Sequence, residues 1–200
     1  MASEGTWGYA PLSQISASKA FYEKISDKDF RKHSWLDPEY VDNPSANKPY
    51  NYRFAGTAED KENFLNGTDQ NPAALPYQSI KFRPAQGECI DYTTGNATDF
   101  PIMRVEEMYF IKAEALAGDG KISDAQKVLS DFMRTRIADG SYSCSAYTDF
   151  ESFTDELLFQ KRVEFWGEGI LIYDYKRLDE GITRGYEGTN QAAVYCYNSE

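Results

Sequence analysis

Charged residues occur in unusual number within one apolar stretch, QKRVEFWGEGILIYDYKR, which covers residues 160–177. Its central charged residues, set among aromatic and aliphatic ones, are Arg162, Glu164, Glu168, Asp174 and Arg177. Glu164 and Glu168 are one helical turn apart, so they project from the same side of a helix. Burial beside one another would raise one pKa and would give the acid and the base that a glycoside hydrolase needs.

A structural role explains these acids better than catalysis does. A glycosidase holds its two carboxylates on either side of a cleft, with the substrate between them, and neighbours on one helical turn cannot do so. Other charges lie at fixed offsets inside the preceding apolar helices: Arg104, Glu107, Glu114, Arg134 and Arg136. Because bidentate pairing with arginine makes buried carboxylates tolerable, we expect ion pairs that fasten the helix near 150–167 to a hairpin formed by residues 103–136.

Composition argues against several classes of function. The net charge of -11 argues against a nucleic-acid partner, since such binding needs a basic face. His33 is the only histidine, and the three cysteines form no Cys-x-x-Cys motif, so a zinc site or a catalytic triad would depend on one residue. Phosphate-binding glycine loops are absent as well. We therefore expect no cofactor and no metal site.

Helical patterns dominate the chain after Pro101. Val105, Met108, Ile111 and Ala115 recur at spacings of three and four, and a glycine at 118 or 120 would end that helix. A second helix is expected to open with the capping box Ser123-Asp124-Ala125-Gln126, and a third after Thr148-Asp149-Phe150-Glu151. The short turn between the first two predicts an antiparallel hairpin resembling one tetratricopeptide unit, whose outer face a single unit cannot bury.

The first hundred residues show weaker patterns. Residues 11–25 are compatible with a short helix whose buried side carries Ile15, Phe21, Tyr22 and Ile25, and residues 50–54 and 77–82 are compatible with short strands. We therefore predict a mainly α fold in three parts. These are a loop-rich part with a short helix and a few short strands (1–100), a helical part (101–180) and an irregular tail (181–200).

Two aromatic residues near the start of the chain do not fit a buried periodic stripe. Trp7 and Tyr9 are flanked by Gly5 and Gly8 and precede the first helical pattern. Most aromatic rings fill cores, but a flat ring in a loop can stack on the apolar face of a sugar. We therefore take Trp7 and Tyr9 as candidate ligand-binding residues.

The helical part resembles the C-terminal portion of the SusD/RagB family. The resemblance depends on "PIMRVEEMYFIKAEALAGDGKISDAQKVLSDFMRTRI" followed by "QKRVEFWGEGILIYDYKRL". The family's markers correspond here to Arg104, Glu107, Glu114, Arg134, Arg136, Arg162, Glu164, Glu168, Asp174 and Arg177. An earlier Asp-x-Arg motif corresponds to Asp29 and Arg31, ahead of Trp35. The spacing from Arg162 to Glu164 is one residue shorter than in the family pattern.

The resemblance implies a non-enzymatic, cell-surface, lipid-anchored outer-membrane protein that binds an oligosaccharide or another nutrient. It also implies delivery of that ligand to a SusC-like, TonB-dependent transporter in a polysaccharide utilization system. The motif residues would belong to the scaffold, and the chain would be the C-terminal portion of a longer protein. Two alternatives stay open: a helical-repeat adaptor that binds a protein and no sugar, and a hydrolase that uses Glu164 and Glu168.

Overall fold

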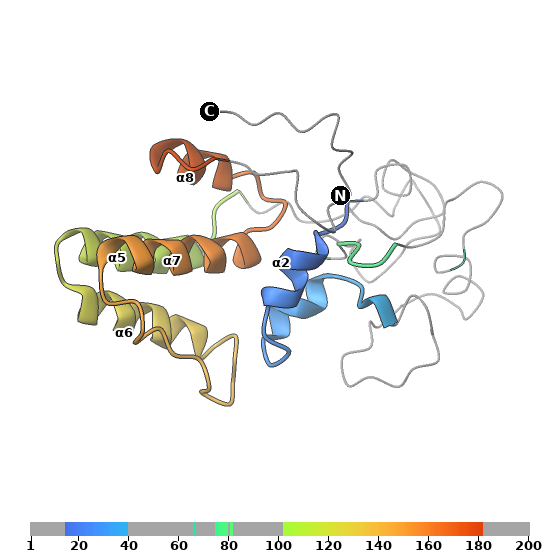
Figure 1. The fold of residues 1–200 in the computed structure, drawn as a ribbon, viewed down its shortest axis with the longest axis horizontal. Coiled ribbons are helices and arrows are strands. Elements are labelled where there is room, and N and C mark those ends of the chain that lie inside the picture. Colours follow the sequence, from blue (N-terminus) through green and yellow to red (C-terminus); the bar gives the residue numbers. More distant parts are fainter. Residues whose placement is uncertain (1–14, 40–65, 67–74, 80, 82–101, 182–200) are drawn as a thin grey trace. The chain divides into compact units, whose positions relative to one another are not determined.

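The computed structural model describes residues 15–39, 66, 75–79, 81 and 102–181. The chain divides into two compact units, a first unit of Met1–Lys24 and Lys32–Phe100 and a helical unit of Ile25–Arg31 and Pro101–Glu200. The principal regular elements, in chain order, are α2 (Lys19–Lys24), the 3₁₀ helix η1 (Phe30–Ser34), α5 (Val105–Gly118), α6 (Ile122–Met133), α7 (Phe150–Glu164) and α8 (Leu171–Arg177) (Figure 1). The described part is mainly helical, which confirms the predicted fold class.

The core of the helical unit lies between α5, α6 and α7. Helix α5 packs against both α6 and α7, and α8 packs against α7. The turn between α5 and α6 contains Gly120, whose positive φ of 76° is the left-handed conformation expected of a glycine after a helix end. Buried apolar residues of all three helices, of the loop before α7 and of the position just after α7 form one cluster: Phe110, Ala113, Ala117, Ala125, Leu129, Phe132, Met133, Ile137, Cys144, Phe153, Leu157 and Phe165.

Helix α5 buries a different face from the one that its spacing suggested. Phe110, Ala113 and Ala117 are almost fully buried. The periodic residues Val105, Met108 and Ile111 are instead 67%, 45% and 48% exposed. Both faces of this helix are apolar, so periodicity marked a helix without identifying its buried side.

The starts of α6 and α7 show one wrong and one accurate local prediction. Helix α6 begins at Ile122, and no side chain caps it, so the expected capping box is wrong. The Gln126 amide donates instead to the carbonyl oxygen of Tyr147, at 2.8 Å. Helix α7 does begin at the predicted position, but its cap is Asp149 rather than the Thr148 of the expected capping box: the Asp149 carboxylate accepts a hydrogen bond of 2.8 Å from the amide of Ser152.

The described residues of the first unit surround a small apolar centre. Phe21, Tyr22, Trp35 and Leu36 are buried, and the rings of Phe21 and Trp35 meet edge to face at 5.7 Å. Ile15 was expected to be buried with them but is 56% exposed, because α2 begins only at Lys19.

Two isolated antiparallel bridges take the place of one predicted strand. Gln78 pairs with Ser16, and Ser79 pairs with Trp35. In the described part of the expected strand at 77–82, residues 77–79 and 81, the prediction of a regular strand is therefore wrong. The expected strand at 50–54 lies outside the described residues. A membrane-crossing helix is not found in the described ranges either, where every helix is too short or too polar.

Candidate functional site

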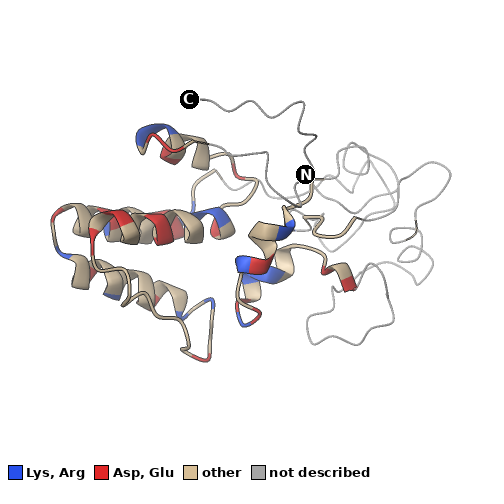
Figure 2. Ribbon diagram, in the orientation of Figure 1, with Lys and Arg blue, Asp and Glu red and all other residues tan. Residues whose placement is uncertain are grey.

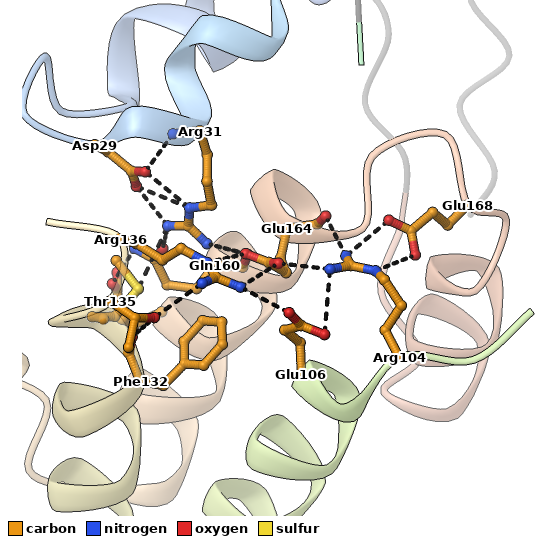
Figure 3. A network of polar contacts seen from close by, with 12 residues as sticks. Asp29, Arg31, Arg104, Glu106, Phe132, Thr135, Arg136, Gln160, Glu164 and Glu168 are labelled. Carbon is orange, nitrogen blue, oxygen red and sulfur yellow. Dashed lines mark hydrogen bonds and ion pairs between the residues drawn. The ribbon is translucent and has the colours of Figure 1, made fainter. Parts of the chain in front are cut away.

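The carboxylate of Glu164, at the end of α7, is the centre of a buried ionic network (Figure 3). Glu164 is 6% exposed. Arg136 donates to both carboxylate oxygens, from Nη2 at 2.9 Å and from Nε at 3.0 Å. Arg104 donates from Nη1 at 2.9 Å, and Arg31 donates from Nη1 at 3.1 Å. Three arginines from three separate parts of the sequence therefore share one carboxylate.

Two further acids lie at the edge of this network. Glu168 accepts two hydrogen bonds from Arg104, at 2.8 and 3.1 Å, in the fork-to-fork geometry that suits a guanidinium. Glu106, in the first turn of α5, contacts Arg136 at 3.2 Å and Arg104 at 3.5 Å. Arg104 and Arg136 thus have at least two acidic partners each, and these partners make the partial burial of the two arginines tolerable.

Arg31 enters the network from the segment Ile25–Arg31. Its guanidinium forms a bidentate pair with Asp29, with Nη2 to Oδ2 at 2.6 Å and Nε to Oδ1 at 3.0 Å. The same guanidinium reaches the Gln160 side-chain oxygen at 2.5 Å and approaches the Met133 sulfur at 3.5 Å. Asp29 and Arg31 are 3% and 5% exposed, so this motif is a buried part of the helical unit.

Aromatic rings cover two of the arginines. The guanidinium carbon of Arg104 is 4.8 Å from the centre of the Phe165 ring, and that of Arg136 is 4.6 Å from the centre of the Phe132 ring. Both distances lie within the range of cation–π attraction. The rings limit the access of water to the network, which strengthens its ion pairs.

The arginines hold Glu164 in its charged form. Burial by itself would raise the pKa of this carboxyl, but the hydrogen bonds and charges of Arg136, Arg31 and Arg104 outweigh burial and lower the pKa from 4.5 to about 2. For Arg104, burial by itself would lower the pKa of the guanidinium. Its hydrogen bonds to Glu168 and Glu164 outweigh burial, so the pKa is raised. Glu164, Arg104 and Arg136 are therefore all stabilised in their charged forms.

This arrangement does not provide the acid and base of a hydrolase. A general acid that acts near neutral pH needs a raised pKa, whereas the pKa of Glu164 is lowered. Both Glu164 and Glu168 also point at the same guanidinium, that of Arg104, rather than across a substrate cleft (Figure 3). The geometry matches the ion-pair role that the sequence favoured.

A second ionic cluster links α5, α7 and α8. Lys161, which is 6% exposed, lies 2.9 Å from Asp174 and 3.5 Å from Glu114. Arg177 contacts the same two acids, both at 2.6 Å. Acidic and basic residues occur on each of the helices α5, α6, α7 and α8 (Figure 2). Those of the second cluster join α5, α7 and α8 to one another.

Several predicted residues lie apart from these clusters. Arg134 is exposed and pairs with Asp131 at 2.7 Å, so only Arg136 of the Arg-x-Arg motif joins the network. The half-buried Glu107 makes no side-chain ion pair or hydrogen bond within the described ranges. Arg162 is half-buried, and its neighbour Lys161 is the α7 cation of the second cluster.

The proposed sugar-stacking residues, Trp7 and Tyr9, lie outside the part of the chain that the structure describes. Sequence reasoning also missed three members of the two clusters, Glu106, Gln160 and Lys161. Glu106 and Lys161 lie next to the predicted motif residues Glu107 and Arg162 in the sequence, and this adjacency could have identified them. For Gln160 the sequence offered no comparable signal, because its partner Arg31 is 129 residues away.

Comparisons with known proteins identify the family. The model of the SusD family matches residues 6–199. Among solved structures, a SusD-like carbohydrate-binding protein from Bacteroides vulgatus is similar, with a TM-score of 0.57 and 20% sequence identity. The match covers 92% of this chain and 32% of that one, so the chain spans about a third of the length of that structure. No match is found among curated proteins. Because the family model matches nearly the whole sequence, the chain belongs to the SusD family.

Proposed function

We propose that the protein binds an oligosaccharide or a related nutrient at the cell surface and delivers it to a TonB-dependent outer-membrane transporter. The single observation that carries this proposal is the SusD family match over residues 6–199. The carbohydrate-binding character of the similar Bacteroides vulgatus protein supports the ligand class. Attachment to the outer membrane and a SusC-like partner are parts of the same proposal.

The binding role is proposed to be non-catalytic. The acid pair that could have served a hydrolase, Glu164 and Glu168, is engaged by Arg104, and Glu164 is held ionised. Binding would come from ring stacking and from hydrogen bonds to sugar hydroxyls, with modest affinity because each contact is weak. Trp7 and Tyr9 stay our candidates for the stacking rings.

Isothermal titration calorimetry of the 200-residue chain tests this proposal. The panel contains oligosaccharides of starch, plant cell-wall and host-glycan type, together with short peptides. We expect heat of binding from at least one glycan and a loss of at least tenfold in affinity for Trp7→Ala or Tyr9→Ala. Tyr173→Ala is the matched control, because Tyr173 is a 71% exposed tyrosine on α8.

The outcomes separate the components of the proposal. Heat from peptides alone would overturn glycan binding. Glycan binding that is unchanged in both aromatic variants would overturn the assignment of Trp7 and Tyr9 and leave the ligand class in place. Glycan cleavage that Glu168→Gln abolishes, without loss of folding, would overturn the non-catalytic role.

One observation favours a second candidate, a helical adaptor that binds a protein partner. Val105, Met108 and Ile111 form an exposed apolar surface along α5, and such a surface is typical of protein contacts. Co-purification distinguishes the candidates: a stable complex with a barrel transporter supports the first, and binding to soluble peptides without any glycan binding supports the second.

A further inference from the structure

The segment Ile25–Arg31 has an unusual place in the chain. It belongs to the helical unit, although the residues before it, through Lys24, and after it, from Lys32, belong to the first unit. Three of its side chains are buried: Ile25, Asp29 and Arg31 are 2%, 3% and 5% exposed. A short segment that is distant in sequence therefore completes the surface of the helical unit.

A backbone hydrogen bond and several side-chain contacts attach this segment to the rest of the helical unit. The amide of Phe30 donates to the carbonyl oxygen of Arg136 at 3.2 Å. The other polar attachments come from side chains: Arg31 contacts Glu164 and Gln160, and Lys28 forms an exposed ion pair with Asp139 at 2.7 Å. Arg136 lies outside α5, α6 and α7, so this backbone hydrogen bond and the side-chain contacts can break while the backbone hydrogen bonds of those helices stay intact.

The segment also carries the counterion of its own buried charge. Asp29 pairs with Arg31 through three side-chain hydrogen bonds and accepts a fourth, of 2.9 Å, from the Arg31 amide. These residues are two positions apart, so the pair persists if the segment leaves the helices. On the helical side, Glu164 would keep Arg104 and Arg136.

Opening would therefore separate two surfaces that are each charge-compensated. The large penalty for breaking a buried ion pair arises when one charge is left without a partner, and neither surface meets that condition here. We propose that Ile25–Arg31 is a latch, which opens and closes as a separate unit while α5, α6 and α7 stay folded. Opening exposes Glu164, Gln160 and Met133 without unfolding the helices that carry them.

Native-state hydrogen exchange of the full chain, followed residue by residue by NMR, tests the latch. In the wild-type protein we expect the amides of Asp29 and Phe30 to exchange at least tenfold faster than those of Phe110 and Leu157. We also expect latch exchange to be insensitive to low denaturant, because little surface is exposed when the latch opens. This measurement needs no substitution.

A variant and a matched control sharpen the test. Arg31→Met should accelerate latch exchange at least tenfold and change α5 and α7 less than twofold. Arg134→Gln, which removes an exposed arginine whose partner is Asp131, should change neither. Equal exchange of latch and helices in the wild type, or equal acceleration of both in Arg31→Met, would overturn the latch. Latch amides that exchange at the rate of an unstructured peptide would overturn it as well.

Discussion

At the scale of single residues, the arginine contacts around Glu164 account for the charge density of the apolar helices. A carboxylate that is 6% exposed would be costly without partners, and here three guanidinium groups compensate it. Removing that carboxylate would leave Arg31, Arg104 and Arg136 crowded together with one fewer anion. Glu164 is therefore the residue whose loss should affect stability most among the charged residues of the network.

The variant Glu164→Gln should lower the free energy of unfolding near neutral pH by on the order of 3 kcal/mol, because the pKa falls from 4.5 to about 2 on folding. The folded-state pKa is the lower one, so this contribution is fully present above about pH 4.5. It is lost as the pH falls towards 2. Urea unfolding at pH 6, 4 and 3 should show the two stability curves converging.

Glu107→Gln is the control for that experiment, since Glu107 is half-buried on α5 and lies outside the network. Its effect on the free energy of unfolding should stay within about 0.5 kcal/mol. Curves for wild type and Glu164→Gln that run parallel from pH 6 to pH 3 would contradict the role assigned to Glu164.

The sequence indicated that the acids would pair with arginines of the hairpin, and Arg104 and Arg136 do so, but it indicated neither that Arg134 stays apart nor that Arg31 takes part. Helical spacing shows which side of a helix a residue occupies, and it carries no information about a partner in another segment. The contact between Arg31 and Glu164 spans 133 positions and could not be inferred from spacing. Within the second cluster the α7 cation is Lys161, because its position on the helix, rather than that of Arg162, brings it to Asp174.

At the scale of elements, helix α5 shows why a strong pattern can indicate the wrong face. Its buried side includes two alanines, Ala113 and Ala117, which allow neighbouring helices to approach closely. Its exposed side carries the larger Val105, Met108 and Ile111. A prediction that gives weight to large apolar residues selects the second side, and only the packing of α6 and α7 decides between the two.

Alanine substitutions at adjacent positions of α5 test this assignment. Phe110→Ala should lower the free energy of unfolding by about 3–5 kcal/mol, because it removes a fully buried ring that contacts Phe132 and Phe165. Ile111→Ala, at a position that is 48% exposed, should change it by less than about 1 kcal/mol. Urea denaturation measures both, and the reverse order would mean that the face indicated by the sequence is the buried one.

At the scale of the whole molecule, the helical unit is assembled from two separate stretches of chain. Its apolar cluster, from Phe110 to Phe165, lies entirely within the second stretch. The first stretch, Ile25–Arg31, adds a compensated ion pair and the backbone hydrogen bond from Phe30 to Arg136. Local composition could suggest the helices after Pro101, but it could not suggest that seven residues near the start of the chain complete them.

This division predicts the behaviour of a fragment that contains residues 102–181 alone. The fragment keeps the whole apolar cluster, and Glu164 keeps Arg104 and Arg136, so circular dichroism should show helices that unfold cooperatively in urea. A synthetic peptide of residues 25–34 should raise the urea midpoint in a saturable manner, since a ligand of the folded state stabilises it. The same peptide with Arg31→Gln should not, because it lacks the guanidinium that reaches Glu164 and Gln160. A fragment without helical structure would show instead that Ile25–Arg31 is an integral part of the helical unit, and it would contradict the independence of the latch.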